Sequence, residues 1–324
     1  MREITYAEAA VEAIQEEMEK DSSIFYMGED VGRFGGVYGT TKGLWERFGD
    51  ERVRDAPLSE AAIIGYALGA AMTGMRPMAE IMFADLLCLA MDQIVNQVAK
   101  IRYMSGGRIK VPLVIRVPLG GLRRAAAQHS QHLESWFVHV PGLKIVAPSS
   151  PYDVKGLLKT VIREDNPVIS FEHILLYKTK GEVPEEEYTL PIGKAEVKRE
   201  GRDVTVVTYS LMVHRCLSAA EKLYEEGIDA EVIDLRSLSP IDIETVINSV
   251  KKTNKVAIVH QACLRGGLGA EIGTSIAEAA FDYLDSPIKR IGGLNVPVPF
   301  SPPLEDFVVP TEERIAREIK EILQ

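Results

Sequence analysis

Two spacings of apolar residues divide the chain into helix-like and strand-like segments. Near the amino terminus, apolar side chains recur three or four residues apart, at Ala10, Val11, Ile14 and Met18. This spacing predicts a helix with one apolar face, and Thr5 followed three residues later by Glu8 is the pattern of a capping box at its start. The short apolar run at 24–27 predicts a buried strand after this helix.

The same alternation continues to the carboxyl terminus. Further strands are predicted at 77–83, 112–117, 143–148, 167–172, 203–210, 230–235, 255–260 and 287–291. Helices are predicted between them, at 60–74, 91–104 and 151–163, before Gly227, after Pro240, before Asp285 and from Thr311. Strands that alternate with helices favour parallel sheets covered on both faces. The predicted fold class is therefore α/β, with doubly wound sheets.

A polar, acidic and proline-bearing segment at 178–201 interrupts this alternation. Such composition is typical of a linker between compact units. We therefore expect two α/β domains, at 1–185 and 186–324.

Two segments are rich in glycine. The first, at 28–44, carries six glycines with little periodicity and is predicted to form a long loop. The second, at 266–273, has the spacing G-x-G-x-x-x-G, which differs from the dinucleotide-binding fingerprint. It predicts a tight turn and a helix start, and a stand-alone NAD-dependent dehydrogenase is disfavoured. In the helix at 60–74, Gly65 and Gly69 share a face that would admit a neighbouring backbone.

Composition and charge exclude several classes of protein. The chain of 324 residues carries a net charge of −10 and no long basic run, which disfavours a nucleic-acid partner. Its three cysteines are too few for a disulfide framework and are predicted to be buried thiols in a reducing compartment. The sequence shows neither a signal-peptide pattern nor an apolar stretch of membrane-spanning length. We expect a cytoplasmic protein with no membrane partner.

Two positions carry candidate chemistry. Glu60 begins a wholly apolar helix, so its carboxylate is predicted to be buried, and a buried carboxylate needs either a partner or a raised pKa. Both conditions suit proton transfer. His129 and His132 are three residues apart in a loop that follows a predicted strand, where open α/β sheets place ligand chemistry. No further Cys or His has the spacing of a zinc ligand, which disfavours a metal site there.

Several long motifs together carry a resemblance to a known family. They are GEDVG at 28–32, DAPLSEAAIIG at 55–65, EIMFADLL at 80–87, DQIVNQVAKIRYMSGG at 92–107, AAQHSQ at 126–131, PGLKIVAPSSPYDVKGLL at 141–158 and PVPFSPPLED at 297–306. The chain resembles, over nearly its whole length, the beta subunit of the thiamine-diphosphate-dependent decarboxylating component of 2-oxo acid dehydrogenase complexes. This family includes the pyruvate, branched-chain 2-oxo acid and acetoin dehydrogenases.

The resemblance implies a transketolase-like pyrimidine-binding domain followed by a transketolase C-terminal-like domain. It assigns Glu60 to the hydrogen bond with the pyrimidine ring nitrogen of thiamine diphosphate, and it assigns Leu58 and Met82 to the lining of the pyrimidine pocket. Leu86 matches a position where relatives stack an aromatic ring on the pyrimidine, so this site departs from the family. His129 matches the active-site histidine that assists acyl transfer to the lipoyl group.

The resemblance also implies a structural potassium ion held mainly by backbone carbonyls. Its ligands would be Leu113, Val161, Ile162, Glu164 and Asn166.

The sequence lacks the residues that usually hold the other half of the cofactor. Thiamine diphosphate enzymes commonly bind Mg²⁺ and the diphosphate through Gly-Asp-Gly and a downstream Asn, because Mg²⁺ prefers hard oxygen ligands. Here the single Gly-Asp pair, Gly49–Asp50, has no second glycine. The resemblance implies that an alpha subunit provides the missing ligands for Mg²⁺ and the diphosphate in a two-alpha, two-beta heterotetramer. It also implies a dihydrolipoyl acyltransferase core as a further partner.

Three functions remain open for this chain. The main expectation is oxidative decarboxylation of pyruvate or a branched-chain 2-oxo acid. An acetoin dehydrogenase beta subunit is the alternative within the family, and a non-catalytic scaffold subunit that docks the complex is the alternative of another class.

Overall fold

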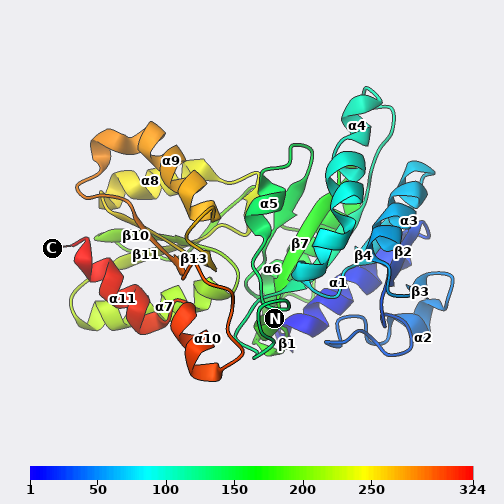
Figure 1. Cartoon of the computed structure of the whole chain (residues 1–324), viewed down its shortest axis with the longest axis horizontal. Helices are drawn as coiled ribbons and strands as arrows, with labels where there is room; N and C mark the ends of the chain where they lie inside the picture. Colours follow the sequence, from blue (N-terminus) through cyan, green and yellow to red (C-terminus); the bar gives the residue numbers. More distant parts are fainter. Residues whose placement is uncertain (324) are drawn as a thin grey trace. The chain divides into compact units, whose positions relative to one another are not determined.

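The computed structural model describes residues 1–323, and these form two compact units (Figure 1). The first unit contains residues 1–119 and 136–192, and the second contains 120–135 and the chain from 193 onward. Segment 120–135 therefore packs with a unit that is distant in sequence. The domain limits expected at 185 and 186 stay a prediction, because compactness alone does not test which parts fold independently.

A parallel sheet forms the centre of the first unit. Its strands run in the order β6 (Lys144–Val146), β7 (Val168–His173), β5 (Val114–Leu119), β4 (Arg76–Glu80), β2 (Ile24–Gly28) and β3 (Val53–Asp55). A separate antiparallel pair joins β1 (Arg2–Thr5) to β8 (Lys180–Val183). Since these six strands are parallel, their carboxyl ends lie at one edge of the sheet. The candidate residues of this unit, Glu60, Met82 and Leu86, come after the carboxyl ends of β3 and β4.

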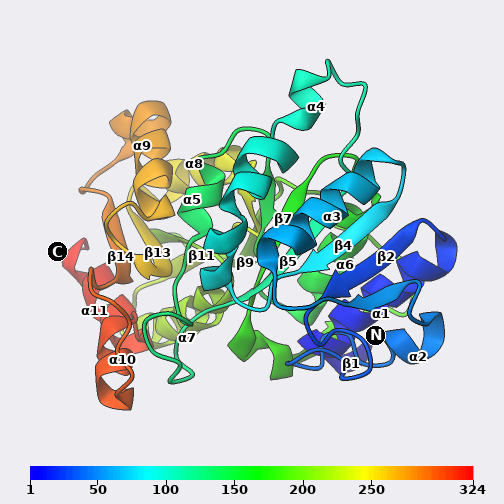
Figure 2. The same cartoon turned by 45° about the vertical axis from the view of Figure 1, so that its right-hand side comes forward.

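Helices cover both faces of this sheet (Figures 1 and 2). On one face α1 (Tyr6–Lys20) packs along α6 (Pro151–Arg163). On the other face α3 (Glu60–Met72) packs against the 3-10 helix η1 (Ala84–Ala90) and the π-helical η2 (Gln93–Val98), followed by α4 (Ile101–Met104). The remaining short helices are α2 (Leu44–Phe48), α5 (Glu134–Val138) and η3 (Ile174–Lys178). This arrangement confirms the predicted doubly wound α/β class.

The local predictions for this unit are confirmed in most places. Thr5 caps α1, with Glu8 N–H donating to Thr5 Oγ1 at 3.2 Å and Thr5 N–H donating to Glu8 Oε2 at 2.8 Å. The segment predicted as a helix at 91–104 is helical, but it is divided by a turn into a π-helical segment and a short α-helix. A Cβ at Gly65 would lie 3.8 Å from the Gln93 side chain, and among residues 1–323 nothing lies within 4 Å of a Cβ placed at Gly69, so neither glycine has a neighbouring backbone of the described residues against it.

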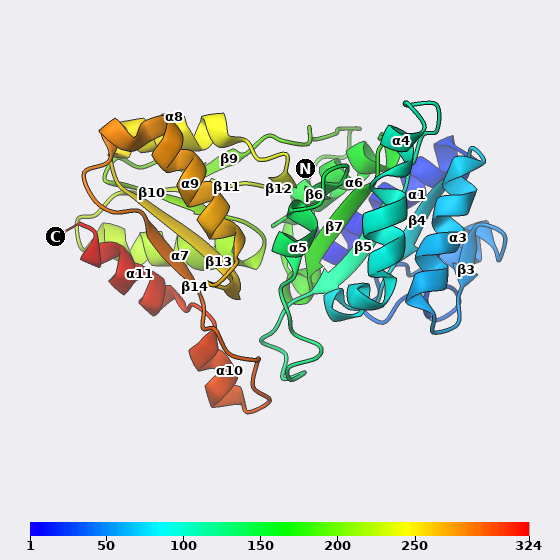
Figure 3. The ribbon, with the colours of Figure 1, turned by 45° about the horizontal axis from the view of Figure 1, so that its top comes forward.

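The second unit is a five-stranded sheet with one reversed edge strand (Figure 3). The strand order is β14 (Lys289–Gly293), β13 (Val256–Cys263), β10 (Val204–Thr208), β11 (Ala230–Asp234) and β9 (Glu196–Arg199), of which only β9 is antiparallel to its neighbour. One face carries α7 (Leu211–Glu225) and α11 (Glu312–Glu321), and the other carries α8 (Ile243–Thr253) and α9 (Leu268–Ala280). The unit also contains β12 (Ser237–Ser239), η4 (Phe281–Tyr283) and α10 (Pro302–Val308).

The second glycine segment surrounds a buried histidine. Gly267 is the N-cap of α9, as the predicted turn and helix start require. A Cβ at Gly267 would lie 2.7 Å from the His260 ring, and Cβ atoms at Gly269 and Gly292 would lie 2.8 and 2.9 Å from it. These approaches are shorter than van der Waals contact allows, so the glycines leave the space that the imidazole fills.

Two further expectations concern the cysteines and the membrane. Cys216 is buried, but Cys88 and Cys263 are exposed, so the prediction of three buried thiols is wrong for two of them. In residues 1–323, every helix is too short or too polar to cross a membrane.

Candidate active site

Glu60 is the first residue of α3, just beyond the carboxyl end of β3. The chain turns there through Ala56, whose N–H donates to the carbonyl of Gly28 at 2.8 Å, and through Pro57. Glu60 is 7% exposed, its carboxylate oxygens keep contact with solvent, and among residues 1–323 no hydrogen bond or ion pair involves them. The helix N-terminus favours a negative charge at this position. The carboxylate is thus in a favourable field but has no hydrogen-bond donor among the residues that the structure describes.

A second buried carboxylate lies beside it. Glu29 follows the last residue of β2, is 7% exposed, and both of its carboxylate oxygens are buried without a hydrogen-bond partner in residues 1–323. Burial raises the pKa of Glu29, and the charges of Glu60 and Asp30 raise it further. Sequence reasoning missed Glu29, although its position directly after a strand in the GEDVG motif was a usable signal. Two carboxylates that repel each other at the end of a sheet are suited to holding a proton.

The repulsion at Glu29 predicts a pH-dependent gain in stability for Glu29→Gln. The pKa of Glu29 is raised in the folded state, so the folded chain binds this proton more tightly than the unfolded chain does. The group therefore costs no stability below its ordinary pKa of 4.5 and becomes destabilising as the pH rises through the folded value. We expect Glu29→Gln to raise the melting temperature at pH 7 and to have little effect at pH 4. Thermal unfolding followed by tryptophan fluorescence measures this.

Glu46→Gln is the matched control, since Glu46 is an exposed glutamate of the same unit. We expect its melting temperature to equal that of the wild type at both pH values. An equal melting temperature of Glu29→Gln and wild type at pH 7 would contradict the repulsion.

The residues expected to line a pyrimidine pocket either lie close to Glu60 in sequence or lie at a helix that packs against α3. Leu58 precedes Glu60 by two residues and is 81% exposed. Met82 and Leu86 are half-buried and follow β4, in and just before η1, which packs against α3. Leu58, Met82 and Leu86 thus provide apolar surface on elements adjoining α3.

A buried ion-pair network fixes the strand ends beneath these residues. Arg116 is 1% exposed and donates to both carboxylate oxygens of Glu172, from Nε at 2.8 Å and from Nη2 at 2.5 Å. Its Nη1 donates to the Tyr26 hydroxyl at 2.9 Å and lies 3.6 Å from Glu80 Oε2, and the Tyr26 hydroxyl in turn donates to Glu80. Strand register places these side chains on one face of the sheet.

This network also holds the first glycine segment. Arg116 Nη1 donates to the carbonyl of Thr40 at 3.3 Å, and the Thr41 hydroxyl donates to the carbonyl of Val31 at 2.8 Å. Gly32 N–H donates to Asp55 Oδ1 at 2.7 Å. The loop predicted at 28–44 is therefore folded against the strand ends near Glu29.

His129 belongs to the second unit, in the loop after β5. Its side chain is exposed, and its carbonyl accepts a hydrogen bond from Arg123 Nη2 at 3.3 Å. His132 is 2.9 Å from Glu134 Oε1 through its Nδ1, and both side chains are nearly buried. Although burial raises it, the charge and hydrogen bond of His132 hold the pKa of Glu134 below its ordinary value. His132 is thus paired with a carboxylate, and residues 1–323 contain no group of three Cys, His, Asp or Glu side chains that could hold a metal ion.

The five residues expected to bind potassium gather around the carboxyl end of α6. The carbonyls of Ile162 and Glu164 accept hydrogen bonds from Arg76 Nη2 at 2.8 and 2.7 Å. The carbonyl of Val161 accepts from Glu164 N–H at 3.3 Å, and that of Leu113 accepts from Val168 N–H at 3.0 Å. The Arg76 guanidinium therefore already places a positive charge against two of these carbonyls.

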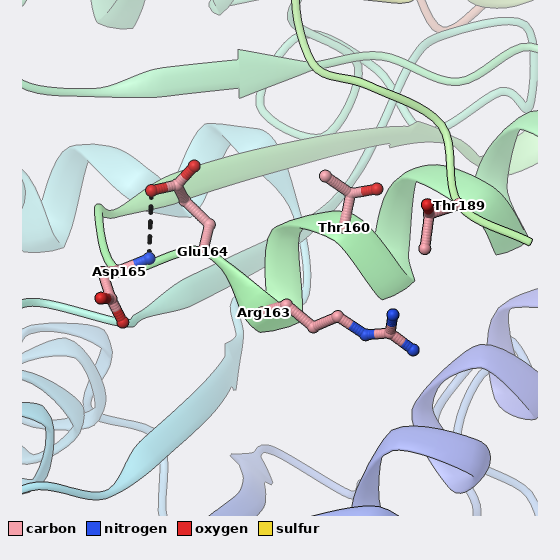
Figure 4. A pocket seen from close by; sticks show the side chains of 5 residues that line it. All are labelled: Thr160, Arg163, Glu164, Asp165 and Thr189. Atoms are coloured by element: carbon pink, nitrogen blue, oxygen red, sulfur yellow. Dashed lines mark hydrogen bonds between the residues drawn. The ribbon is translucent and has the colours of Figure 1, made fainter.

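Side chains near this helix end are paired with one another as well. The Asn166 amide donates to Glu164 Oε1 at 2.6 Å, and Lys144 Nζ donates to Glu164 Oε2 at 2.6 Å. Figure 4 shows the adjoining pocket, lined by Thr160, Arg163, Glu164, Asp165 and Thr189, with the Asp165 N–H donating to the Glu164 carboxylate.

Comparison with known proteins places the chain in a family. The profile for the transketolase pyrimidine binding domain matches residues 2–180, and the profile for the transketolase C-terminal domain matches residues 193–315. The 2-oxoisovalerate dehydrogenase subunit beta of Bacillus subtilis (strain 168) is 48% identical and aligns over 100% of each chain. The pyruvate dehydrogenase E1 component subunit beta of Chaetosphaeridium globosum is also 48% identical, over 99% of each chain.

The chain belongs to the beta-subunit family of the 2-oxo acid and acetoin dehydrogenases.

As a member of this beta-subunit family, the chain is a subunit of an oxidoreductase, and the resemblance drawn from its motifs is confirmed. The family also includes the acetoin:2,6-dichlorophenolindophenol oxidoreductase subunit beta of Cupriavidus necator, 48% identical over 97% of this chain and 96% of that one. A solved structure titled as a split gene transketolase, inactive beta4 tetramer, matches with a TM-score of 0.80 and 24% identity over 99% of this chain and 98% of that chain. This structural match confirms the transketolase-like fold.

The transketolase-like family implies thiamine diphosphate as the cofactor. One observation indicates that the pyrimidine-binding unit of this chain can hold the pyrimidine half of thiamine diphosphate. Glu60 is 7% exposed at the start of a helix, and no group of residues 1–323 donates a hydrogen bond to its carboxylate, so this acceptor is available to a donor on a ligand.

Proposed function

We propose that the chain is the beta subunit of a 2-oxo acid dehydrogenase first component, active together with an alpha subunit. The reaction is the oxidative decarboxylation of pyruvate or a branched-chain 2-oxo acid, with transfer of the acyl group to the lipoyl group of a dihydrolipoyl acyltransferase. The fragment left after decarboxylation is oxidised to the acyl level as the lipoyl disulfide is reduced, so that one sulfur carries the acyl group as a thioester and the other becomes a thiol. The observation that carries the proposal is Glu60, a largely buried residue of the pyrimidine-binding unit whose carboxylate receives no hydrogen bond from residues 1–323.

Six side chains of this chain have roles in the proposed reaction. When bound, thiamine diphosphate supplies the electron sink for decarboxylation. Glu60 accepts a hydrogen bond from the pyrimidine ring nitrogen and holds the proton shared with it, while Glu29 keeps a second carboxylate close enough to influence that proton. Leu58, Met82 and Leu86 provide apolar contact to the ring and exclude water from it. His129 holds and releases a proton during acyl transfer, for which an imidazole is suited near pH 7.

An alpha subunit is proposed to supply the ligands for Mg²⁺ and the diphosphate. Two observations support this division. Residues 1–323 contain no cluster of metal-binding side chains, and the chain has no complete Gly-Asp-Gly motif. In addition, large apolar side chains are exposed on elements that pack side by side around α3: these are Leu58, Tyr66, Met72, Leu89, Tyr103 and Met104. Exposed apolar surface of this kind is typical of protein–protein interfaces.

The divided site predicts that the chain by itself is inactive. With thiamine diphosphate and Mg²⁺ added, we expect no 2-oxo acid-dependent reduction of 2,6-dichlorophenolindophenol by the chain alone, and activity once the alpha subunit is added. Turnover by the chain alone would contradict a shared active site. A tagged pull-down from the native host identifies the partners: an equimolar chain bearing the Gly-Asp-Gly motif, with an acyltransferase behind it, is expected.

Acetoin is a second candidate substrate. Two relatives named as acetoin:2,6-dichlorophenolindophenol oxidoreductase subunits, from Cupriavidus necator and Bacillus subtilis, are 48% and 47% identical to this chain, about as similar as the 2-oxo acid dehydrogenase subunits. Assaying the reconstituted complex with acetoin, pyruvate and branched-chain 2-oxo acids distinguishes these substrates.

Two narrower assignments stay predictions. Potassium binding by the carbonyls of Leu113, Val161, Ile162 and Glu164 and the side chain of Asn166 would compete with hydrogen bonds that these groups already make, including two from Arg76 to the Ile162 carbonyl. The cytoplasmic location expected from the sequence likewise stays a prediction.

A further inference from the structure

The loop that precedes His129 has an unusual backbone. Leu122, Arg124 and Ala126 have φ values of +69°, +61° and +60°, and Gly120 has +112°. Three residues other than glycine in the left-handed region, two positions apart, are unfavourable on their own. This conformation therefore requires contacts outside the loop that favour it over alternatives.

A single buried carboxylate provides such contacts. Glu305, in α10 of the same unit, is 0% exposed. Its Oε1 accepts the N–H of Leu122 at 2.6 Å, and its Oε2 accepts the N–H of Arg124 at 3.1 Å and Arg124 Nη1 at 2.9 Å. Backbone N–H groups that converge in this way form an anion-binding concavity, and here the anion is a side chain of the protein itself.

Two features show that the loop is built around this carboxylate. Gly121 directly precedes the first backbone donor, Leu122, and a Cβ there would be only 3.2 Å from Glu305 Oε1, so a residue without a side chain allows the approach. The Arg124 guanidinium completes the contacts by donating to the carbonyl of Pro302 at 3.0 Å and to Asp306 Oδ2 at 3.0 Å. Because the buried charge is matched by three donors, it holds the turn at 122–124 firmly.

The held turn contacts the backbone around His129. Arg123, between the two Glu305-bound N–H groups, donates from Nη2 to the carbonyl of His129 at 3.3 Å. Ser130, the next residue, is 1% exposed, and its Cβ lies 3.6 Å from a Cβ placed at Gly121. His129 thus stands as an exposed side chain on a backbone whose neighbours are fixed.

We propose that Glu305 is a positioning residue that acts through the turn at 122–124 to hold His129 in place for acyl transfer. The inference rests on the proposed function of His129. Glu305 does not contact the reacting groups. It determines where the His129 backbone lies. Since a displacement of about 1 Å in a reacting group can cost about 100-fold in rate, loss of the carboxylate should slow the step that uses His129.

Glu305→Gln tests the proposal in the complex reconstituted with the alpha subunit. The amide keeps the size of the side chain but directs an NH₂ group at one of the two backbone donors. We expect transfer to a lipoylated acyltransferase domain to fall by about 10- to 100-fold. Reduction of 2,6-dichlorophenolindophenol, which bypasses the lipoyl group, is expected to change by less than about twofold, because it does not use the step assigned to His129.

The matched control is Asp306→Asn. Asp306 is the neighbouring carboxylate on the same helix and also contacts Arg124, but its side chain is 52% exposed. Exposed ion pairs contribute little, so both rates should stay within about twofold of the wild type.

A double-mutant cycle separates positioning from general damage. If Glu305 acts through His129, Glu305→Gln should cause no further loss of transfer in a His129→Ala background. Losses that multiply would overturn the proposal, as would wild-type transfer by Glu305→Gln when His129→Ala is impaired about 100-fold. Full transfer by His129→Ala would instead reject the proposed role of His129, and with it any action of Glu305 through that residue.

Arg124→Met keeps the test decisive if Glu305→Gln does not assemble. This variant removes one of the three donors and leaves both backbone N–H groups on the carboxylate. We expect about 3- to 10-fold slower transfer with unchanged dye reduction. An unchanged transfer rate in Arg124→Met would overturn the proposal.

Discussion

Replacing Glu60 by glutamine is expected to lower the turnover of the reconstituted complex at least about 100-fold while leaving its assembly intact. Glutamine has nearly the same shape, so the packing of α3 should persist. It lacks the carboxylate that would hold the proton shared with the pyrimidine ring, and positioned proton transfer typically contributes about 10²- to 10⁴-fold. Initial rates of both lipoyl acylation and dye reduction measure the effect, since both depend on the cofactor.

Glu271→Gln is the matched control for that substitution. Glu271 is also a glutamate in the first turn of a helix, α9, but it is exposed. Its replacement removes the same favourable interaction with a helix dipole and should leave turnover unchanged. Near-normal turnover of Glu60→Gln would remove Glu60 from the mechanism and would favour the non-catalytic scaffold that the sequence left open.

Replacing Arg116 by methionine is expected to destabilise the first unit by about 3–5 kcal/mol. The variant leaves Glu172 and Glu80 buried without their cation, and an uncompensated buried charge is costly. For a unit of this size, that loss corresponds to a melting temperature lower by roughly 10 °C. Both tryptophans of the chain, Trp45 and Trp136, belong to the first unit, so tryptophan fluorescence reports its unfolding directly.

Two further variants test the cause. Arg47→Met breaks an exposed ion pair, in which Arg47 lies 2.7 Å from Glu19, and should cost less than about 1 kcal/mol. Arg116→Met combined with Glu172→Leu removes both charges of the main pair and should recover a large part of the lost stability. A double variant as unstable as Arg116→Met alone would show that packing, rather than the unpaired carboxylate, accounts for the loss.

The exposed apolar surface around α3 connects the fold to the proposed assembly. The glycines at 65 and 69 were expected to admit a neighbouring backbone, and residues 1–323 place none against Gly69. Tyr66 and Met72 on the same helix are also exposed. These features agree with a helix that packs against the proposed alpha subunit, and pull-down of that subunit would test the association.

Local signals in the sequence were sufficient for the architecture. The alternation of strand-like and helix-like segments predicted the doubly wound α/β class, and the capping pair Thr5 and Glu8 predicted the start of α1. These features depend on side-chain periodicity and on hydrogen bonds between residues three apart in the sequence. Short stretches of sequence are therefore enough to predict them. The motifs around Glu60 and His129 likewise identified the family, because they are long, ordered runs.

Only the tertiary structure showed which carboxylates lie together and which backbone they hold. Glu29 and Glu60 are 31 positions apart in the sequence and become neighbours because parallel strands bring their carboxyl ends to one edge. Glu305 is about 180 residues from the turn that it binds, and no local pattern links an acidic side chain to backbone N–H groups so far away. The glycines at 267 and 269 predicted a tight turn and a helix start, and only the folded chain showed that they also leave space for the His260 ring. Sequence thus determined the elements and the chemistry present, whereas packing over long separations decided which groups meet, since burial and charge pairing are properties of the folded chain.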